Sequence, residues 1–449
     1  MRVLVVGSGG VGDAVARIAA RRRFFDLMVL ADFDVSRAER SVAAARAAAP
    51  PERADCFVAE HVDASDAEAV AALARRHGIT HVLNAVDPRF VMPVFEGAFA
   101  AGADYLDMAM SLSRPHPTDP YRRPGLKLGD EQLAASERWS AAGRLALVGM
   151  GVEPGLSDVF ARYASDHLFS SIVELGTRDG SNLVVVDDDG QEIFAPSFSI
   201  WTTIEECLNP PVIWEASRAQ EEDGGWRTVE PFHEPELFDF PGGIGPVECV
   251  HVEHEEVLLM PRYLKAERVT FKYGLGEEFI SVLRTLHRLG LDRTAEVRVR
   301  SADPAAPGSV AVSPRDVVAA CLPDPASLGD RMRGVTCAGL LVTGTGSDGR
   351  PREVYLHHLV DNAWSMSEYG AQCVVWQTAV NPVVALELLA RGTWDDVGVM
   401  GPEAFDAVPF LDLLAAPAPE GYGSPWGLQE RQPQAGLAGE PSLERPALR

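Results

Sequence analysis

The sequence predicts an α/β Rossmann domain, which is a doubly wound parallel sheet, with an inserted α+β domain built on a mostly antiparallel sheet. Three observations predict this fold. A glycine-rich turn follows the first buried strand, strands and helices alternate over the first 150 residues, and strands outnumber helices after about residue 170. The expected parts are a dinucleotide-binding domain over 1–150, a substrate and dimerisation domain over 151–360, helices returning to the Rossmann domain over 361–415, and a disordered tail over 416–449.

The first elements are a strand over 2–6, a glycine turn and a helix over 13–23. Gly7, Gly9 and Gly12 fit the pattern G-x-G-x-x-G. The first glycine allows the tight turn, the second lets the backbone approach a pyrophosphate, and the third lets the helix pack against the strand. The unpaired N–H groups at the helix start then face the phosphates.

The next buried strand runs over 27–30 and leads into Ala31 and Asp32. Asp32 follows Gly12 by 20 residues. A carboxylate there accepts hydrogen bonds from the ribose hydroxyls and repels a 2′-phosphate. The sequence therefore predicts NAD rather than NADP, although Arg37 is a nearby cation that could favour the phosphate. The alternative is a glycine-rich turn that binds nothing, and the complete order of strand, glycines, helix, strand and acid disfavours it.

The same alternation continues to residue 107. Helices are expected over 38–49, 66–77 and 93–101, and strands over 56–63, 81–86 and 104–107. Ligands of such a sheet lie beyond the carboxyl ends of its strands. The predicted cofactor-binding residues are Gly7, Ser8, Gly9, Gly10, Val11, Gly12, Asp32, Asp63, Asn84, Ala85 and Asp107. Loop capping is the alternative role for Asn84 and Asp107.

The remaining chain begins with a proline-rich loop over 111–129. A helix over 131–142, a strand over 145–149 and a turn into a helix at 149–160 follow. Further strands are expected over 172–178, 183–186, 257–260, 268–273, 295–299, 336–343 and 354–358. Helices are expected over 277–289 and, as a pair broken near Asn381 and Pro382, over 369–389.

Composition excludes several classes of protein. The net charge of −25 argues against a nucleic-acid-binding surface, which needs clustered Lys and Arg. No apolar run approaches the length of a membrane span. The six cysteines are scattered without C-x-x-C spacing, as is typical of reduced thiols in a cytoplasmic protein, so we expect neither a disulfide framework nor a metal site.

Residues 233–272 hold a dense cluster of titratable side chains. His251, Glu253, His254, Glu255 and Glu256 lie within six positions. An extended conformation would place the first, second and fourth of these on one face and His254 on the other, which disfavours a zinc site. A histidine or glutamate there could move the proton that C–N bond chemistry requires. A solvated strand edge is the alternative interpretation of the cluster.

Arg262, Lys265 and Lys272 follow this cluster. A substrate carboxylate needs an Arg or Lys partner, and Arg262 is the best candidate.

The sequence resembles the saccharopine dehydrogenase-like family, which includes lysine 6-dehydrogenases and carboxynorspermidine dehydrogenases. The resemblance rests on residues 3–12 with 31–32, 82–85 with 105–107, the segment Gly-Val-Glu-Pro-Gly-Leu-Ser-Asp at 151–158, and 398–403 with 410–411. It implies a Rossmann domain completed by C-terminal helices, an inserted sheet domain, and often a homodimer. It also implies oxidation of a C–N bond or reduction of an imine. The chain departs from the family pattern at Met108–Met110.

The predicted function is NAD-dependent oxidoreduction of a C–N bond in a small amino acid, opine or polyamine-like substrate. The candidate catalytic residues are Glu153, His251, His254 and Arg262. Two alternatives stay open. One is a carboxynorspermidine-type reductase of an imine formed from a diamine and an aldehyde. The other is a regulatory protein that binds NAD without turnover.

Overall fold

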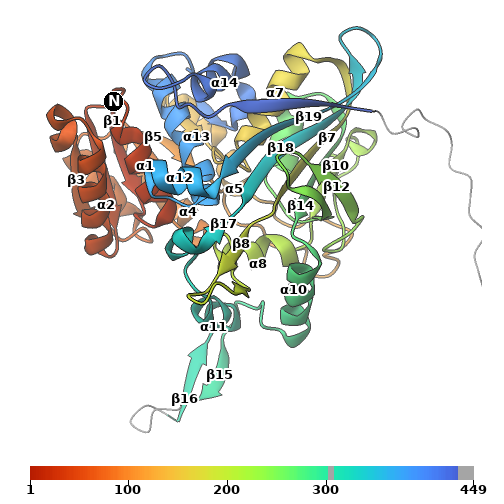
Figure 1. The fold of residues 1–449 in the computed structure, drawn as a ribbon, viewed down its shortest axis with the longest axis horizontal. Coiled ribbons are helices and arrows are strands. Elements are labelled where there is room, and N and C mark those ends of the chain that lie inside the picture. Colours follow the sequence, from red (N-terminus) through yellow and green to blue (C-terminus); the bar gives the residue numbers. More distant parts are fainter. Residues whose placement is uncertain (302–307, 433–449) are drawn as a thin grey trace, which may run out of the picture.

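The computed structural model describes residues 1–301 and 308–432, and its first domain is a seven-stranded parallel sheet (Figure 1). The strand order is β20-β6-β5-β4-β1-β2-β3. These strands are β1 (Arg2–Val6), β2 (Leu27–Asp32), β3 (Phe57–His61), β4 (His81–Asn84), β5 (Asp104–Asp107), β6 (Leu145–Leu147) and β20 (Gly398–Met400). The crossovers make this a doubly wound sheet, so the predicted Rossmann fold is confirmed.

Helices cover both faces of this sheet. They are α1 (Gly10–Ala20), α2 (Val35–Ala48), α3 (Ala67–Arg76), α4 (Val91–Ala101), α5 (Asp130–Leu133) and α6 (Ser136–Ala141). The start of α1 differs from the expected residue 13, because Gly9 is already its N-cap and the glycine turn leads directly into the helix. The expected helix over 131–142 is two short helices.

The second domain is a nine-stranded sheet entered through α7 (Leu156–His167). Its main path is β11-β10-β14-β7-β18-β19-β21, and β13 pairs with β14 and β12. These strands are β7 (Phe169–Ser181), β10 (Val212–Glu215), β11 (Trp226–Thr228), β12 (Glu236–Phe240), β13 (Gly245–His251), β14 (Ala266–Gly274), β18 (Val335–Gly346), β19 (Pro351–Asp361) and β21 (Trp426–Arg431). Only β14 and β7 pair in parallel in this described sheet, which confirms its mostly antiparallel character.

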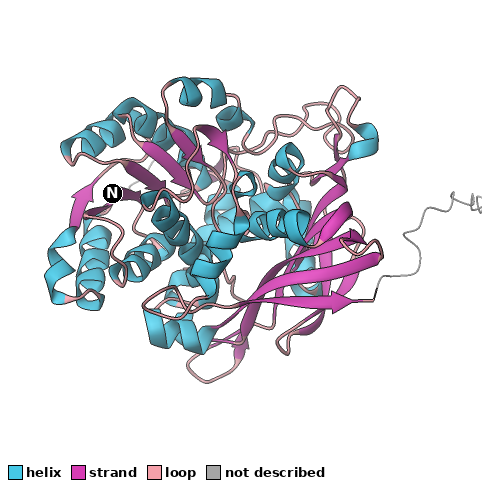
Figure 2. Cartoon of the chain, turned by 90° about the horizontal axis from the view of Figure 1, so that it is seen from above, coloured by secondary structure: helices cyan, strands magenta, loops and turns pink. Residues whose placement is uncertain are grey.

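The second domain also contains several helices and short strands, and in the view from above helices lie between the two sheets (Figure 2). The helices are α8 (Ile200–Leu208), α9 (Glu256–Tyr263), α10 (Glu277–Leu289) and α11 (Pro314–Cys321). The short strands are β8 (Val184–Val186), β9 (Glu192–Ile193), β17 (Met332–Arg333) and the hairpin of β15 (Val297–Arg300) and β16 (Ser309–Val312). The strand expected over 257–260 was wrong. Four consecutive apolar residues fit a buried helix as well as a strand, and here they form α9.

The chain then returns to the first domain through α12 (Asn362–Tyr369), α13 (Cys373–Ala390) and α14 (Ala407–Ala415). The expected break at Pro382 was wrong, since α13 is continuous and the break falls at Gly370, which has φ 63°. Burial on all sides holds this helix together despite its proline. It is long and apolar enough to cross a membrane, and 83% of that apolar window is buried within the fold.

The expected disorder from residue 416 was wrong for 416–432, while 433–449 lie outside the described residues. The strand β21 pairs with β19. Ahead of it, the Arg22 guanidinium donates to the main-chain oxygens of Pro419 and Gly421 at 2.7 and 2.9 Å. The same guanidinium forms a two-pronged ion pair with Glu387 of α13, at 2.8 and 2.9 Å.

We predict that Arg22→Ala will lower the free energy of unfolding by about 2 kcal/mol, because it removes the two-pronged partner of the buried Glu387 carboxylate. The carboxylate then keeps only Arg391 and the Tyr422 hydroxyl as partners. The substitution will also expose residues 416–432 to protease. Denaturant unfolding and limited proteolysis measure the two effects. The control is Arg23→Ala, which removes an exposed ion pair with Glu52 and should cost about 1 kcal/mol or less. Equal effects of the two substitutions would contradict this account.

Candidate functional site

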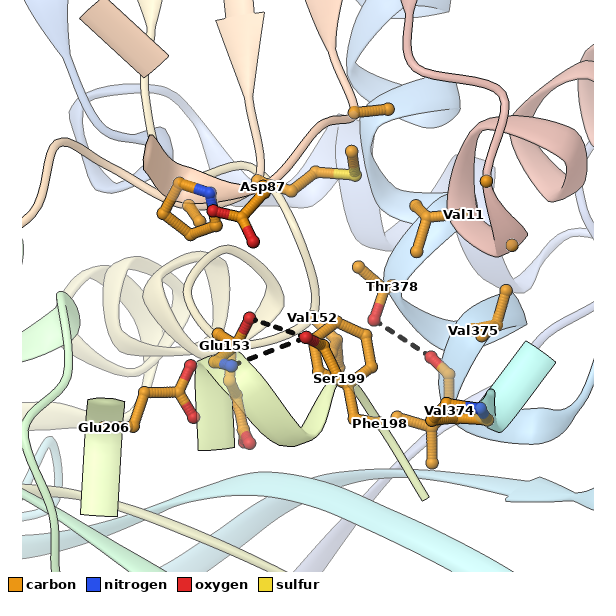
Figure 3. Close-up of a pocket in the computed structure, with 18 of the residues that line it drawn as sticks. Val11, Asp87, Val152, Glu153, Phe198, Ser199, Glu206, Val374, Val375 and Thr378 are labelled. Atoms are coloured by element: carbon orange, nitrogen blue, oxygen red, sulfur yellow. Dashed lines mark hydrogen bonds between the residues drawn. The ribbon is translucent and has the colours of Figure 1, made fainter. Parts of the chain in front are cut away.

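A cavity of about 330 Å³ lies where the carboxyl ends of the parallel strands face the second sheet (Figure 3). Elements distant in sequence form its wall: the glycine turn, the loop after β4, the crossing segment at 152–154, α8 and α13. The predicted cofactor residues that line it are Gly9, Gly10, Val11, Asn84 and Ala85, and the predicted catalytic residues that line it are Glu153 and His254.

The glycine turn has the shape that a dinucleotide requires. Gly7 has φ +102°, and a Cβ there would lie 2.5 Å from the carbonyl oxygen of Ala85. A Cβ at Gly12 would overlap the carbonyl oxygen of Gly7. A Cβ at Gly9 would meet nothing within 4 Å, so this residue leaves open space at the start of α1. The open space and the free N–H groups of the first turn fit a pyrophosphate.

Asp32 and Asp63, the acids predicted to bind the cofactor, lie at or just after the ends of β2 and β3, near this turn. The Asp32 carboxylate accepts hydrogen bonds from the backbone N–H groups of Ser8 (2.8 Å) and Asp34 (2.9 Å). Asp63 follows the neighbouring strand, and its carboxylate accepts from the N–H and hydroxyl of Ser65, which lowers the pKa of Asp63. Both acids lie at the carboxyl ends of their strands, as the sequence predicts. Neither of them lines the cavity.

Asp107, another predicted cofactor residue outside the cavity wall, lies in the interior of the first domain. It is fully buried and accepts hydrogen bonds from the backbone N–H of Gly149 and the amide of Gln132, each at 2.7 Å. Burial raises the pKa of Asp107 to about 7. It therefore ties β5 to the crossing segment rather than contacting a ligand. Asn84 lines the cavity, and its amide donates to the Tyr105 hydroxyl.

His254 is the histidine of this cavity. Its Nδ1 lies 2.5 Å from a Glu256 oxygen, and its ring stacks on Phe271 with centroids 3.9 Å apart. Burial lowers the pKa of His254, but the carboxylates of Glu256, Glu255 and Glu206 overcome this and raise it to about 10. Nε2 has no hydrogen-bond partner among the described residues, so it is the nitrogen available to the cavity.

Acidic side chains dominate the rest of the wall. They are Asp87, Glu153, Asp179, Glu206, Glu255 and Asp324, and none of the described lining residues is Lys or Arg. Burial raises the pKa of Glu206 to about 8 and that of Asp179 to about 7. The pKa of Glu153 is raised by burial and by the neighbouring Asp179. One Glu153 oxygen accepts from the backbone N–H of Gly339 at 3.0 Å.

Two predicted catalytic residues lie outside the cavity. His251 is fully buried, with Nδ1 3.0 Å from the Phe271 carbonyl oxygen and Nε2 3.4 Å from Glu234. Arg262 is exposed on α9, where it donates to the Leu258 carbonyl oxygen and lies over the Trp226 ring. It does not line the cavity, so the structure does not place it where the predicted substrate carboxylate would bind. The reason is local: β13 ends at His251, so residues 252–255 form a loop and do not alternate as a strand would.

Three side chains at the end of this loop and the start of α9 have the spacing of metal ligands. The ligand atoms of His254, Glu255 and Glu256 lie within 4.8 Å of one another. Each already has a partner, because Glu256 pairs with His254 and accepts from Ser157, and Glu255 accepts from the N–H of Met110. The donors are thus used by the protein itself.

Asp179, Glu206 and Tyr273 are cavity residues that the sequence prediction missed. Asp179 and Tyr273 lie near the ends of β7 and β14, whose parallel pairing places them opposite each other. Glu206 lies on α8 next to Cys207, in a segment without a recognisable motif. Only the pairing of distant strands reveals the first two, and no local signal marks the third.

Family models match most of the chain. Residues 3–147 match the saccharopine dehydrogenase NADP binding domain, and residues 151–417 match the saccharopine dehydrogenase C-terminal domain. A carboxynorspermidine synthase of Vibrio alginolyticus is 29% identical over 436 residues, covering 96% of this chain and 98% of that protein. A carboxyaminopropylagmatine dehydrogenase of Synechocystis is 27% identical over 428 residues, covering 95% and 96%.

A solved structure shares the whole architecture. Apo saccharopine dehydrogenase (L-Glu forming) from Saccharomyces cerevisiae superposes with a TM-score of 0.62 and 14% identity. The match covers 96% of this chain and 100% of that one. This likeness concerns the fold.

We predict that stability falls as pH rises from 5 to 9 through the raised carboxyl pKa values, because the folded state holds protons that the unfolded state has released. Glu206, with its pKa near 8, is one source of this slope. Glu206→Gln cannot ionise and should flatten the dependence of Tm on pH, while Glu39→Gln at an exposed position of α2 should not. An unchanged slope in Glu206→Gln would contradict the assignment.

Proposed function

Because this chain belongs to the saccharopine dehydrogenase family of oxidoreductases, we propose that it reduces the imine formed between an aldehyde and a cationic diamine or polyamine. The proposal includes the reverse oxidation of the resulting secondary amine. It also includes NAD as the preferred dinucleotide.

The observation that carries this proposal is the charge of the cavity wall. Six carboxyl-bearing residues line it, and the described lining holds neither Lys nor Arg. Asp87 is already paired with Arg89 and Glu255 accepts from the Met110 N–H. An ammonium group can replace the lost hydration of Glu153, Asp179 and Glu206 by direct pairing, whereas an anionic substrate would find only the His254 imidazole. The names of the two relatives, a carboxynorspermidine synthase and a carboxyaminopropylagmatine dehydrogenase, support a polyamine-like substrate.

The overall reaction fixes what the protein must supply. An aldehyde, a protonated primary amine, NADH and one proton give a protonated secondary amine, NAD⁺ and water. The bound dinucleotide supplies the hydride. The residues must bind the ammonium groups, assist the loss of water from the adduct of amine and aldehyde, and provide the proton.

His254 is the group suited to the proton transfers. Glu256 holds Nδ1, which fixes the ring and stabilises the imidazolium, and Nε2 is left for the substrate. The imidazolium can protonate the departing hydroxyl of the amine–aldehyde adduct. Phe271 stacks flat on the ring and keeps it in position. The Ser157 hydroxyl, 3.1 Å from Glu256, anchors the acid in turn.

Glu153, Asp179 and Glu206 are suited to the binding of the amine. Their raised pKa values mean that part of this group holds protons when no cation is present. An arriving ammonium favours the ionised carboxyls and displaces those protons. A substrate with a single carboxylate and no amine gains nothing from this wall, which disfavours a simple hydroxy acid.

We predict that purified protein will oxidise NADH only when a diamine and an aldehyde are both present. Loss of NADH absorbance measures turnover across diamines, and identification of the secondary amine by mass spectrometry confirms the product. Tight NADH binding without turnover on any amine, including lysine and polyamines, would instead favour a regulatory NAD-binding protein.

The role of His254 is tested by His254→Gln combined with Glu256→Gln, which avoids leaving Glu256 buried without its partner. We expect kcat to fall by about 10²–10⁴-fold with the fold retained. His233→Gln removes an exposed imidazole and serves as the control. A double variant within about threefold of the original kcat would contradict the role.

The cofactor preference is tested at Asp32. Asp32→Ser should raise the KM for NADH by about tenfold, which corresponds to about 1.4 kcal/mol of lost ribose bonding, and should improve the use of NADPH. Asp34→Ser makes the same charge change two residues away and keeps an N-cap for α2, so it should alter neither constant. A parent enzyme that prefers NADPH would contradict the assignment to Asp32.

A further inference from the structure

A second cavity, of about 600 Å³, adjoins the first. Phe198 and Tyr273 line both cavities, so the two spaces share a wall. The second is bounded by the segment from β8 to α8 and by the connection from β14 to α10. The two cavities are therefore neighbours that meet at these two aromatic side chains.

The far wall of the second cavity combines aromatic and acidic side chains. Phe194 and Phe279 stack, with ring centroids 5.3 Å apart and an angle of 23° between their planes. Phe194 remains 37% exposed despite this contact. Glu192, Glu277 and Glu278 line the same cavity, and its described lining contains no Lys or Arg.

These acids have no described cation as a partner. Glu192, Glu277 and Glu278 form no ion pair with the described residues. Glu277 and Glu278 lie in the first turn of α10. The positive end of the helix dipole stabilises negative side chains there, which accounts for two acids at this end of the helix. The helix dipole does not account for the stacked pair of Phe194 and Phe279, which lines the same cavity. Aromatic faces beside carboxylates form the kind of surface that binds organic cations.

We propose that this second cavity binds the distal cation, an ammonium or guanidinium group, of an extended amine whose near end reacts in the first cavity. This inference rests on the proposed function and adds a substrate class to it: linear amines with a second or third cationic group. Such a ligand runs from the carboxyls beside His254, past Phe198 and Tyr273, to the Phe194–Phe279 pair.

The consequence is selectivity by length and charge. A short diamine reaches only the first cavity, while a longer cation also meets the aromatic pair. A cation–π contact at a partly exposed site corresponds to about a 2- to 30-fold gain in affinity. An amine of the same length without the distal charge loses that gain.

The test compares kcat/KM for 1,3-diaminopropane, 1,4-diaminobutane, agmatine, spermidine and the monoamine butylamine, with one aldehyde and NADH. We expect kcat/KM for agmatine or spermidine to exceed that for 1,3-diaminopropane about tenfold. Phe279→Leu keeps an apolar side chain and removes the aromatic face. Glu278→Gln removes one charge. Each should lower the ratio of long to short amine several-fold, chiefly through KM.

Two substitutions outside both cavities serve as matched controls. Tyr121→Leu removes an exposed aromatic ring and Glu39→Gln removes an exposed acid, and both should leave the ratio and the activity unchanged. Agmatine and spermidine separate a guanidinium from an ammonium preference, and either result supports the proposal.

Turnover of short diamines with no gain for longer cations, or a ratio that Phe279→Leu and Glu278→Gln do not alter, would overturn the second binding site and leave the proposed function standing. No turnover with any amine would overturn both.

Discussion

The burial of several carboxyl groups around one imidazole is the constraint on which the site depends. His254 pairs with Glu256 and is also influenced by Glu255 and Glu206, and together they keep the ring charged despite its burial. Isolated carboxylates this deep are costly, so the folded protein either retains protons on them or pairs them with cations. The His254 imidazolium supplies one such cation and Arg89 pairs with Asp87, while Glu153, Asp179 and Glu206 face the cavity. The proposed preference for a positively charged ligand rests on this uneven balance.

Two of the chain's crossings between its domains assemble this site. The first crossing, through residues 149–155 into α7, carries Glu153 to the cavity and Ser157 to Glu256. The second, through α12 and α13, brings β20 to the edge of the parallel sheet and leaves α13 on the cavity wall. Arg22 joins α1 to α13 and to the segment before β21. The glycine turn and the acidic wall are therefore linked through α1 and α13.

Sequence patterns predict the Rossmann half well, because glycine spacing, strand ends and Asp32 are local signals with a defined geometry. They predict the acidic wall poorly. Asp179 and Tyr273 meet through the pairing of β7 with β14, which no local pattern encodes. The loop at 252–255 turned a supposed strand into a bend, so His254 entered the cavity while His251 and Arg262 did not. Residues 416–432 contact Arg22, nearly 400 residues earlier in the chain, and no local pattern encodes this contact.

The most direct test of the central claim is calorimetric titration of the protein with 1,3-diaminopropane near pH 7, repeated in buffers of different ionisation enthalpy. The diamine is already fully protonated there, so any protons that appear on binding come from the protein. The acidic wall predicts binding with net release of protons, reduced in Glu206→Gln. Binding without proton release, or tighter binding of a dicarboxylate than of the diamine, would contradict the account.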